Sequence, residues 1–238
     1  MKDNKHIKAV FFDAADTLFY INGGLGNVYS SVASKYGSNP DPNLIDSAFS
    51  NAFRSAPPLV FGGVSSEDRK VYEKKWWYRV VQNVFDEVGM FDEFDSYFEE
   101  LFEVFRNTAW KLFPETQEVL SSLENNGFKI GLISNFDTRV YDVCQALGIY
   151  DYFRSFVISS EAGFAKPSPQ IFEIALNEQG VLAEESILIG DSIEHDILGA
   201  KSIGMNSALL DREENYNHRA DLITIRDLTQ VLNLLGIV

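Results

Sequence analysis

The sequence predicts an α/β protein with a doubly wound parallel sheet and an inserted helical domain. Three features support this fold class: apolar runs of strand length, amphipathic segments of helix length between them, and a long aromatic-rich stretch that interrupts the series. A chain of 238 residues is long enough for one large domain with a smaller insert.

The apolar runs mark the strands of the expected sheet. Helical candidates near 138–147, 168–179 and 195–203 separate the last four runs, at the connection lengths that right-handed crossovers between parallel strands require. The five runs are Ala9–Phe12, Ile130–Ile133, Ser155–Ile158, Ile187–Ile189 and Ser207–Leu210.

The insert follows the first run, and the interval between residues 21 and 110 shows no convincing strand. Helices are expected near 27–36, after the capping signal at Ser65, and near 92–106. In the helix after Ser65, apolar residues recur at three-and-four spacing. We therefore expect two domains, a core formed by residues 1–20 and 110–238 and a helical domain formed by residues 21–109.

Composition and charge exclude several classes of function. The chain has 20 Lys and Arg against 35 Asp and Glu, a formal net charge of −15. Such an acidic chain repels phosphate backbones and anionic lipids, so we expect neither a nucleic-acid nor a membrane partner. Cys144 is the single cysteine, which excludes an internal disulfide framework. Since no signal peptide is apparent either, a cytoplasmic location is expected.

Polar side chains follow three of the predicted strands. Asp13 comes directly after the first run, Ser134 and Asn135 follow the second, and Asp191 follows the fourth after one glycine. In open parallel sheets, ligands bind beyond the carboxyl ends of the strands, so these side chains should converge. A single such residue is more often a turn former, and it is their convergence that indicates a site.

These residue types suit the binding of a phosphate and a hard cation. Two carboxylates in one crevice, Asp13 and Asp191, need a neutralising cation such as Mg²⁺, and Asp196 lies close enough in sequence to support the same site. Lys166, which precedes a proline, offers a positive charge for an oxyanion. Ser134 precedes a predicted helix, whose free amide groups form a natural phosphate site.

Four segments that contain these residues resemble the motifs of a known family. Asp13 to Leu18, Ser134-Asn135, Lys166-Pro167 and the segment from Gly190 to Asp196 occur in the order of the four motifs of the haloacid dehalogenase-like (HAD) hydrolase superfamily. The resemblance covers essentially the whole chain and implies a Rossmann-like core. The helical insert resembles the C1 cap of subfamily I, most closely in the rhythmically expressed protein 2-like group.

The resemblance implies a role for each matching residue. Asp13 matches the nucleophile that forms an aspartyl-phosphate. The Mg²⁺ ligands would be Asp13, the main-chain carbonyl of Ala15, Asp191 and Asp196. Catalytic Ser134 and Lys166 match the groups that hold the phosphoryl oxygens, with Asn135 beside them in the phosphate site. The expected partner is a small phosphorylated substrate bound between cap and core.

One position departs from the family's phosphatases, in which the residue two after the nucleophile is an acid/base Asp. Here it is Ala15, and Asp16 is the nearest substitute. General acid–base assistance is typically worth about 10²–10⁴ in rate, so its loss slows alkyl phosphate hydrolysis most. Three alternatives therefore stay open: a phosphonatase, a dehalogenase and a non-catalytic binding protein. A phosphonatase would need a cap lysine, for which the candidates are Lys35, Lys70, Lys74 and Lys75.

Overall fold

The computed structural model describes residues 7–216 and 219–237, and its main sheet has six parallel strands in the order β5-β4-β1-β6-β7-β8. This confirms the predicted fold class and all five predicted strands. The sixth strand, β8, has two residues and is too short to show a periodic pattern. The strands are β1 (Ala9–Phe12), β4 (Lys129–Ser134), β5 (Ser155–Ile158), β6 (Ser186–Gly190), β7 (Asn206–Leu210) and β8 (Thr224–Ile225).

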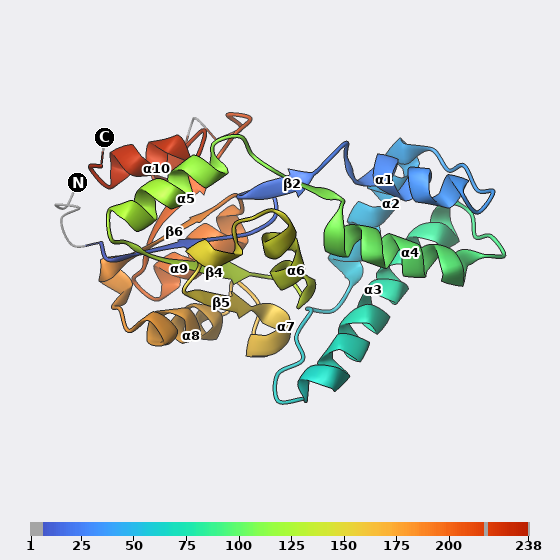
Figure 1. Cartoon of the computed structure of the whole chain (residues 1–238), viewed down its shortest axis with the longest axis horizontal. Helices are drawn as coiled ribbons and strands as arrows, with labels where there is room; N and C mark the ends of the chain where they lie inside the picture. Colours follow the sequence, from blue (N-terminus) through green and yellow to red (C-terminus); the bar gives the residue numbers. More distant parts are fainter. Residues whose placement is uncertain (1–6, 217–218, 238) are drawn as a thin grey trace.

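Helices cover both faces of the sheet, as Figure 1 shows with α5 and α10 above it and α8 below. Alternate side chains of β1 serve the two faces: Val10 and Phe12 pack with α5, α6 and α10, whereas Ala9 and Phe11 pack with α8 and α9. These helices are α5 (Thr116–Asn125), α6 (Arg139–Ala146), α8 (Pro169–Gln179), α9 (Gly199–Ser202) and α10 (Thr229–Leu234).

The connection after β6 differs from the helix expected near 195–203. It begins as a π-helix, η3, over Ile193–Leu198 and continues as the short helix α9. The other short elements are η1 (Tyr150–Tyr152), α7 (Ser159–Ala162) and η2 (Ala183–Glu185). No helix within the described residues combines the length and apolar character that crossing a bilayer requires.

Four further helices form a group beside the sheet, which we call the inserted helices (Figure 1). Three of them match predicted helices, and Ser65 caps the third by accepting a hydrogen bond from the Asp68 amide at 3.1 Å. The second was not predicted, although Asp41 caps it and Pro42 occupies its first position. The inserted helices are α1 (Leu25–Ser34), α2 (Pro42–Ser55), α3 (Ser66–Val88) and α4 (Phe94–Asn107).

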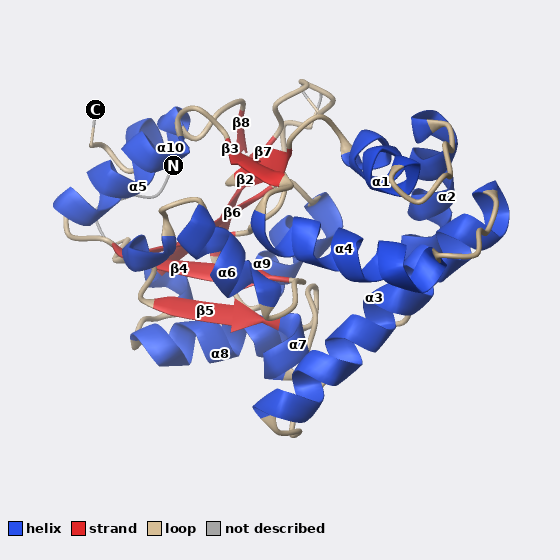
Figure 2. Cartoon of the chain, turned by 45° about the vertical axis from the view of Figure 1, so that its right-hand side comes forward, coloured by secondary structure: helices blue, strands red, loops and turns tan. Residues whose placement is uncertain are grey.

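The chain enters and leaves the inserted helices through a small antiparallel sheet. Strand β2 (Phe19–Ile21) pairs with β3 (Trp110–Leu112), so that Ile21 lies opposite Trp110. The expectation of no strand between residues 21 and 110 is therefore wrong at its two ends, where each strand contributes one residue. Figure 2 shows that β4 and β5 point their carboxyl ends toward the inserted helices. Residues that follow the strands thus face that group.

Candidate active site

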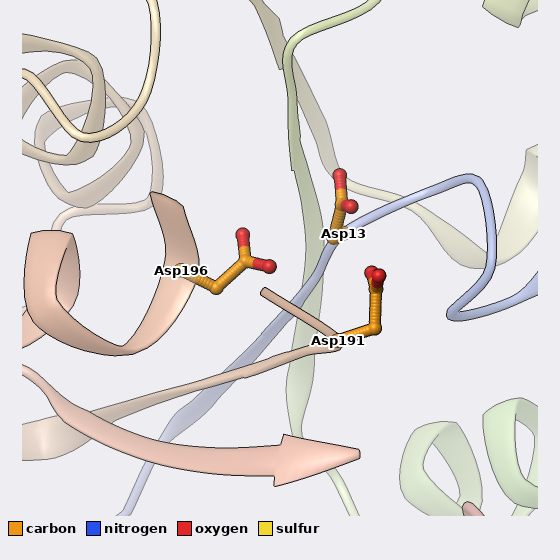
Figure 3. Close-up of side chains that lie close together, drawn as sticks. All are labelled: Asp13, Asp191 and Asp196. Atoms are coloured by element: carbon orange, nitrogen blue, oxygen red, sulfur yellow. The ribbon is translucent and has the colours of Figure 1, made fainter. Parts of the chain in front are cut away.

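Three aspartates converge beyond the carboxyl edge of the sheet. Asp13 follows β1, Asp191 follows β6, and Asp196 comes from the π-helix; one carboxylate oxygen of each lies within 4.8 Å of the other two. Figure 3 shows the three carboxyl groups directed toward a common space. A Cβ atom at Gly190 would lie 2.3 Å from the Asp196 carboxyl carbon, so only glycine permits this approach. The structure thus brings together the acidic residues that the strand ends predicted.

Lys166 completes this cluster as its buried cation. Its Nζ lies 2.8 Å from Asp13 Oδ1 and 2.5 Å from Asp196 Oδ1, and the residue is 4% exposed. The side-chain amide of Asn135 holds the Lys166 main chain: it accepts from the Lys166 N–H at 2.7 Å and donates to the Lys166 carbonyl at 3.0 Å. Asn135 therefore positions the lysine. Ser134, which is 3% exposed, lines a cavity together with Lys166 and the three aspartates.

The cluster carries more negative than positive charge. Burial and the charges of Asp13, Asp196 and Asp16 raise the pKa of Asp191 to about 7. Burial also raises the pKa of Asp196, against the opposing effect of Lys166. Burial alone would lower the pKa of Lys166, but the two carboxylates beside it raise that pKa above its ordinary value. Oxygen ligands with uncompensated charge are what a hard divalent cation prefers, so the residues present fit Mg²⁺.

The segment after Asp13 makes a tight turn that faces the same space. Asp16 has a φ of 60°, a left-handed conformation, and its N–H donates to the Phe19 carbonyl at 2.8 Å. Ala15 and Asp16 both line the cavity. Although the Asp16 side chain is open to the cavity, partial burial and the charge of Asp13 raise its pKa.

Two residues that the sequence did not single out support this turn. Thr17 is fully buried, and its hydroxyl donates to Asp191 Oδ1 at 3.1 Å. Arg212 donates to the Thr17 carbonyl at 3.2 Å and pairs with Glu115 at 2.7 Å. The threonine in the Asp13 motif was the available signal for the first contact. Arg212 lies far away in sequence and gave none.

The acidic cluster lies at one end of a cavity of about 330 Å³ between the sheet and the inserted helices. The polar floor of the cavity consists of Asp13, Asp16, Ser134, Asn135, Arg139, Lys166, Asp191, Ser192, His195 and Asp196. The apolar wall consists of eleven residues between positions 21 and 105, namely Ile21, Leu25, Tyr29, Phe49, Phe53, Trp77, Val81, Phe98, Leu101, Phe102 and Phe105.

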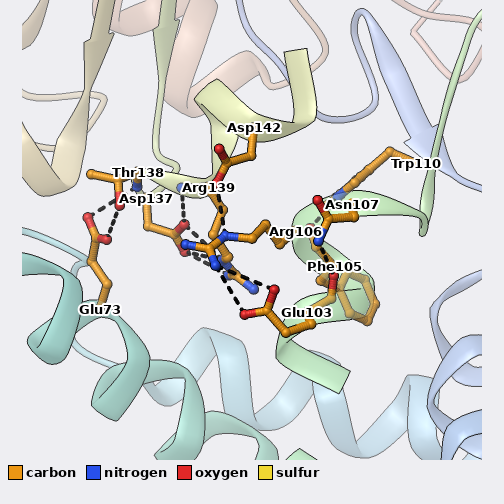
Figure 4. A network of polar contacts seen from close by, with 10 residues as sticks. All are labelled: Glu73, Glu103, Phe105, Arg106, Asn107, Trp110, Asp137, Thr138, Arg139 and Asp142. Atoms are coloured by element: carbon orange, nitrogen blue, oxygen red, sulfur yellow. Dashed lines mark hydrogen bonds and ion pairs between the residues drawn. The ribbon is translucent and has the colours of Figure 1, made fainter. Parts of the chain in front are cut away.

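Helix α3 and the segment after β4 meet in a buried polar contact (Figure 4). Asp137 accepts hydrogen bonds from the Arg139 guanidinium, one of them at 2.7 Å, and from the indole N–H of Trp77. The guanidinium carbon lies 5.0 Å from the Trp77 ring centre. Next to it, Glu73 accepts from the Thr138 N–H at 3.1 Å. These contacts join the inserted helices to the floor of the cavity, and sequence reasoning missed all of them.

A parallel sheet with acidic residues beyond its carboxyl edge, covered there by inserted helices, defines an α/β protein whose acidic cluster could hold a metal ion. A sequence model of the haloacid dehalogenase-like hydrolases matches residues 7–204, and the chain belongs to this family.

Individual relatives agree with this assignment. The chain is 31% identical over 240 aligned residues to the glyceraldehyde 3-phosphate phosphatase of Methanothermobacter thermautotrophicus, covering 96% of this chain and 100% of that protein. It is 29% identical over 221 residues to haloacid dehalogenase-like hydrolase domain-containing protein 3 of Danio rerio, covering 91% and 90%. The magnesium-bound structure of the HAD-hydrolase YfnB from Bacillus subtilis matches the fold with a TM-score of 0.75 at 16% identity, covering 98% and 100%.

Proposed function

We propose that this chain is a Mg²⁺-dependent phosphatase that cleaves a small phosphorylated metabolite through an aspartyl-phosphate on Asp13. The observation that carries the proposal is the set of three carboxylates and one buried lysine at the floor of an otherwise apolar cavity. A phosphate dianion can contact a cation and an ammonium group there at the same time. The name of the relative that is 31% identical supports the same reaction type.

Asp13 is the proposed nucleophile. One of its oxygens attacks phosphorus, a bond forms between them, the ester P–O bond breaks, and the departing oxygen takes its proton from water. A second water then attacks the aspartyl-phosphate, which releases inorganic phosphate and frees the carboxylate. Lys166, 2.8 Å from Asp13, stabilises the non-bridging phosphoryl oxygens together with Ser134.

Asp13, Asp191 and the main-chain carbonyl of Ala15 would hold the Mg²⁺, with Asp196 in the same acidic group. When bound, Mg²⁺ neutralises charge on the transferring phosphoryl group. Asp196 accepts from Lys166 through one oxygen and from the Ser192 N–H at 3.0 Å through the other. We therefore assign Asp196 mainly to holding Lys166 and to adding negative charge to the site.

Neither alternative hydrolase is favoured by the cavity. Within residues 21–109, all described by the structure, no lysine lines the cavity, so a Schiff base of the phosphonatase type has no donor there. Lys35 and Lys74 instead pair with Glu100 and Glu99. A dehalogenase needs no cation, whereas this cluster has excess negative charge, which also opposes a departing halide.

The finer assignments are part of the same proposal. We place the chain in subfamily I with a C1 cap, in the rhythmically expressed protein 2-like group. We divide it into a core of residues 1–20 and 110–238 and a cap of residues 21–109. A cytoplasmic location agrees with the single, buried Cys144.

The proposal is tested by phosphate release from 4-nitrophenyl phosphate and glyceraldehyde 3-phosphate, with Mg²⁺ and with EDTA. We expect release that needs Mg²⁺ and falls at least about 10⁴-fold in Asp13→Asn, because the nucleophile is lost. Asp151→Asn, a matched change at an exposed position outside the cavity, should keep the wild-type rate. Folded, Mg²⁺-binding protein that releases no phosphate would instead support the non-catalytic alternative.

A further inference from the structure

The apolar wall bears directly on which substrate the site accepts. None of its eleven side chains is charged, and the segment that supplies them is described throughout. Among the described residues, the one charged side chain of the cavity lining that packs against these rings is Arg139, whose guanidinium pairs with Asp137. Two of the eleven carry a polar atom: the Trp77 indole N–H already donates to Asp137, which leaves the Tyr29 hydroxyl. A polyol or sugar bound against this wall would lose water from several hydroxyl groups and find almost no partners.

The wall is also shaped by aromatic rings in contact with one another. Phe49 packs edge-on against Tyr29 at 6.0 Å and stacks on Phe53 at 5.5 Å, and Phe53 stacks on Trp77 at 6.0 Å. Flat aromatic groups pack well on such surfaces. The cavity volume of about 330 Å³ is near the lower end for ligand pockets, which suits one ring with its phosphate rather than a nucleotide or a peptide.

The polar floor gives an independent indication. Ala15 cannot donate a proton to the departing oxygen, so a leaving group that is stable as an anion departs more easily from this site. A phenolate has a conjugate acid with a pKa of about 10, as in tyrosine, whereas water and alkoxides lie near 16. The absence of an acidic residue at position 15 therefore slows the hydrolysis of a phenyl ester much less than that of an alkyl ester.

From these two observations we propose that the physiological substrate is a small phosphate monoester of a phenol, an aryl phosphate with an apolar ring. This inference rests on the proposed function. In the reaction the aryl P–O bond breaks as the bond from Asp13 to phosphorus forms, and the phenolate takes its proton from water after it departs. The phosphate lies on the polar floor and the ring against the apolar wall.

Three substrates separate the two contributions: phenyl phosphate, benzyl phosphate and glycerol 3-phosphate. Phenyl and benzyl phosphate present similar rings but different leaving groups, and we expect kcat/KM to be about 10² or more higher for phenyl phosphate. Benzyl and glycerol phosphate are both alkyl esters but differ in polarity, and we expect kcat/KM to be about tenfold or more higher for benzyl phosphate. Equal kcat/KM for glycerol 3-phosphate and phenyl phosphate would overturn the proposal.

Variants test whether Ala15 causes the preference for a phenolate leaving group and whether Phe49 contributes to the preference for an apolar ring. Ala15→Asp should raise the rate for benzyl phosphate more than for phenyl phosphate. Phe49→Asn should shrink the preference for benzyl over glycerol phosphate, while Leu44→Asn, on the same helix, 58% exposed and outside the cavity lining, should not. If Phe49→Asn does not fold, the wild-type series still decides. If none of the three substrates releases phosphate in the presence of Mg²⁺, the proposed phosphatase activity itself is overturned. If phosphate is released and glycerol 3-phosphate is the preferred substrate, only the proposed aryl preference is overturned.

Discussion

The polar floor and the apolar wall face each other across one cavity but are built differently. The floor consists of residues at the carboxyl edge of the sheet, and its charged groups are fixed by mutual contacts: Lys166 lies between Asp13 and Asp196, and Thr17 holds Asp191. Apart from Ile21 at the end of β2, the wall consists of side chains on the inserted helices, held by ring packing. In the proposed function, the chemistry is thus assigned to the carboxyl edge of the sheet and substrate selection to the inserted helices.

The two regions meet at the contact of Asp137 and Arg139 with Trp77. Arg139 is 6% exposed and Asp137 is fully buried, so this ion pair is shielded from water. It lies just beyond Asn135, which positions Lys166. Changes on either side of this contact therefore show how far the floor and the wall depend on each other.

Among the changes that compare the floor with the wall, the largest effect is expected from Lys166→Met, which tests the floor alone. It removes the ammonium group that pairs with Asp13 and contacts phosphate, so kcat should fall about 10³-fold or more. Initial rates with 4-nitrophenyl phosphate at saturating Mg²⁺ measure this. The control is Lys201→Met, an exposed lysine outside the cavity lining. Equal rates in the two variants would remove Lys166 from the proposed mechanism.

Asp137→Ala tests the contact between the two regions. It leaves the Arg139 guanidinium buried without its carboxylate, which should lower the free energy of unfolding by about 3 kcal/mol. Urea denaturation followed by circular dichroism measures this. Asp142→Ala, on the helix that begins at Arg139, removes a half-exposed carboxylate that pairs with Arg106 and should cost less than about 1 kcal/mol. Similar losses in both variants would show that the buried Asp137–Arg139 pair stabilises the fold no more than the half-exposed pair does.

The pKa of Asp191 predicts how pH changes the stability of the metal-free protein and its affinity for Mg²⁺. In the metal-free protein this pKa is about 7, above the ordinary 3.8, so the native state holds the proton more tightly than the unfolded chain. The free energy of unfolding without metal should therefore fall as pH rises from 3.8 toward about 7. Mg²⁺ must displace this proton, so its affinity should rise about tenfold per pH unit below about pH 7 and level off above. Calorimetric titration at several pH values measures this, and a pH-independent affinity would contradict it.

The smallest effect is expected from Trp77→Phe. The phenyl ring still covers Arg139, but the N–H donor to Asp137 is lost, which should cost about 1 kcal/mol in the free energy of unfolding. Trp76→Phe is the matched control, because its indole donates at 2.8 Å to the Pro57 carbonyl at an exposed position. Thermal denaturation of both variants tests whether the polar contact or the ring itself joins the two regions.

How much could be predicted from the sequence differs between the floor and the wall. Asp13 and Asp191 each follow a buried strand, and the geometry of parallel sheets brings such residues to one edge. Their convergence could therefore be predicted without coordinates. The role of the Asn135 side chain could not, because its hydrogen bonds to Lys166 join residues 31 positions apart.

The wall could not be predicted because helix periodicity does not distinguish a side chain in a helical core from one that lines a cavity. Val81 and Val84 lie on the same face of α3 and are both buried in the packed core, yet Val81 also lines the cavity and Val84 does not. Helix α2, which supplies Phe49 and Phe53, was itself not predicted. Its cap at Asp41 was the signal available.

The most direct test of the proposed chemistry is to trap the covalent intermediate. Protein mixed with excess 4-nitrophenyl phosphate and Mg²⁺ is quenched in acid within milliseconds, digested and mapped by mass spectrometry. We predict a phosphoryl group on the peptide that contains Asp13, present in wild type and absent in Asp13→Asn. Rapid turnover with no phosphoryl group on that peptide would contradict the assignment of Asp13 as nucleophile.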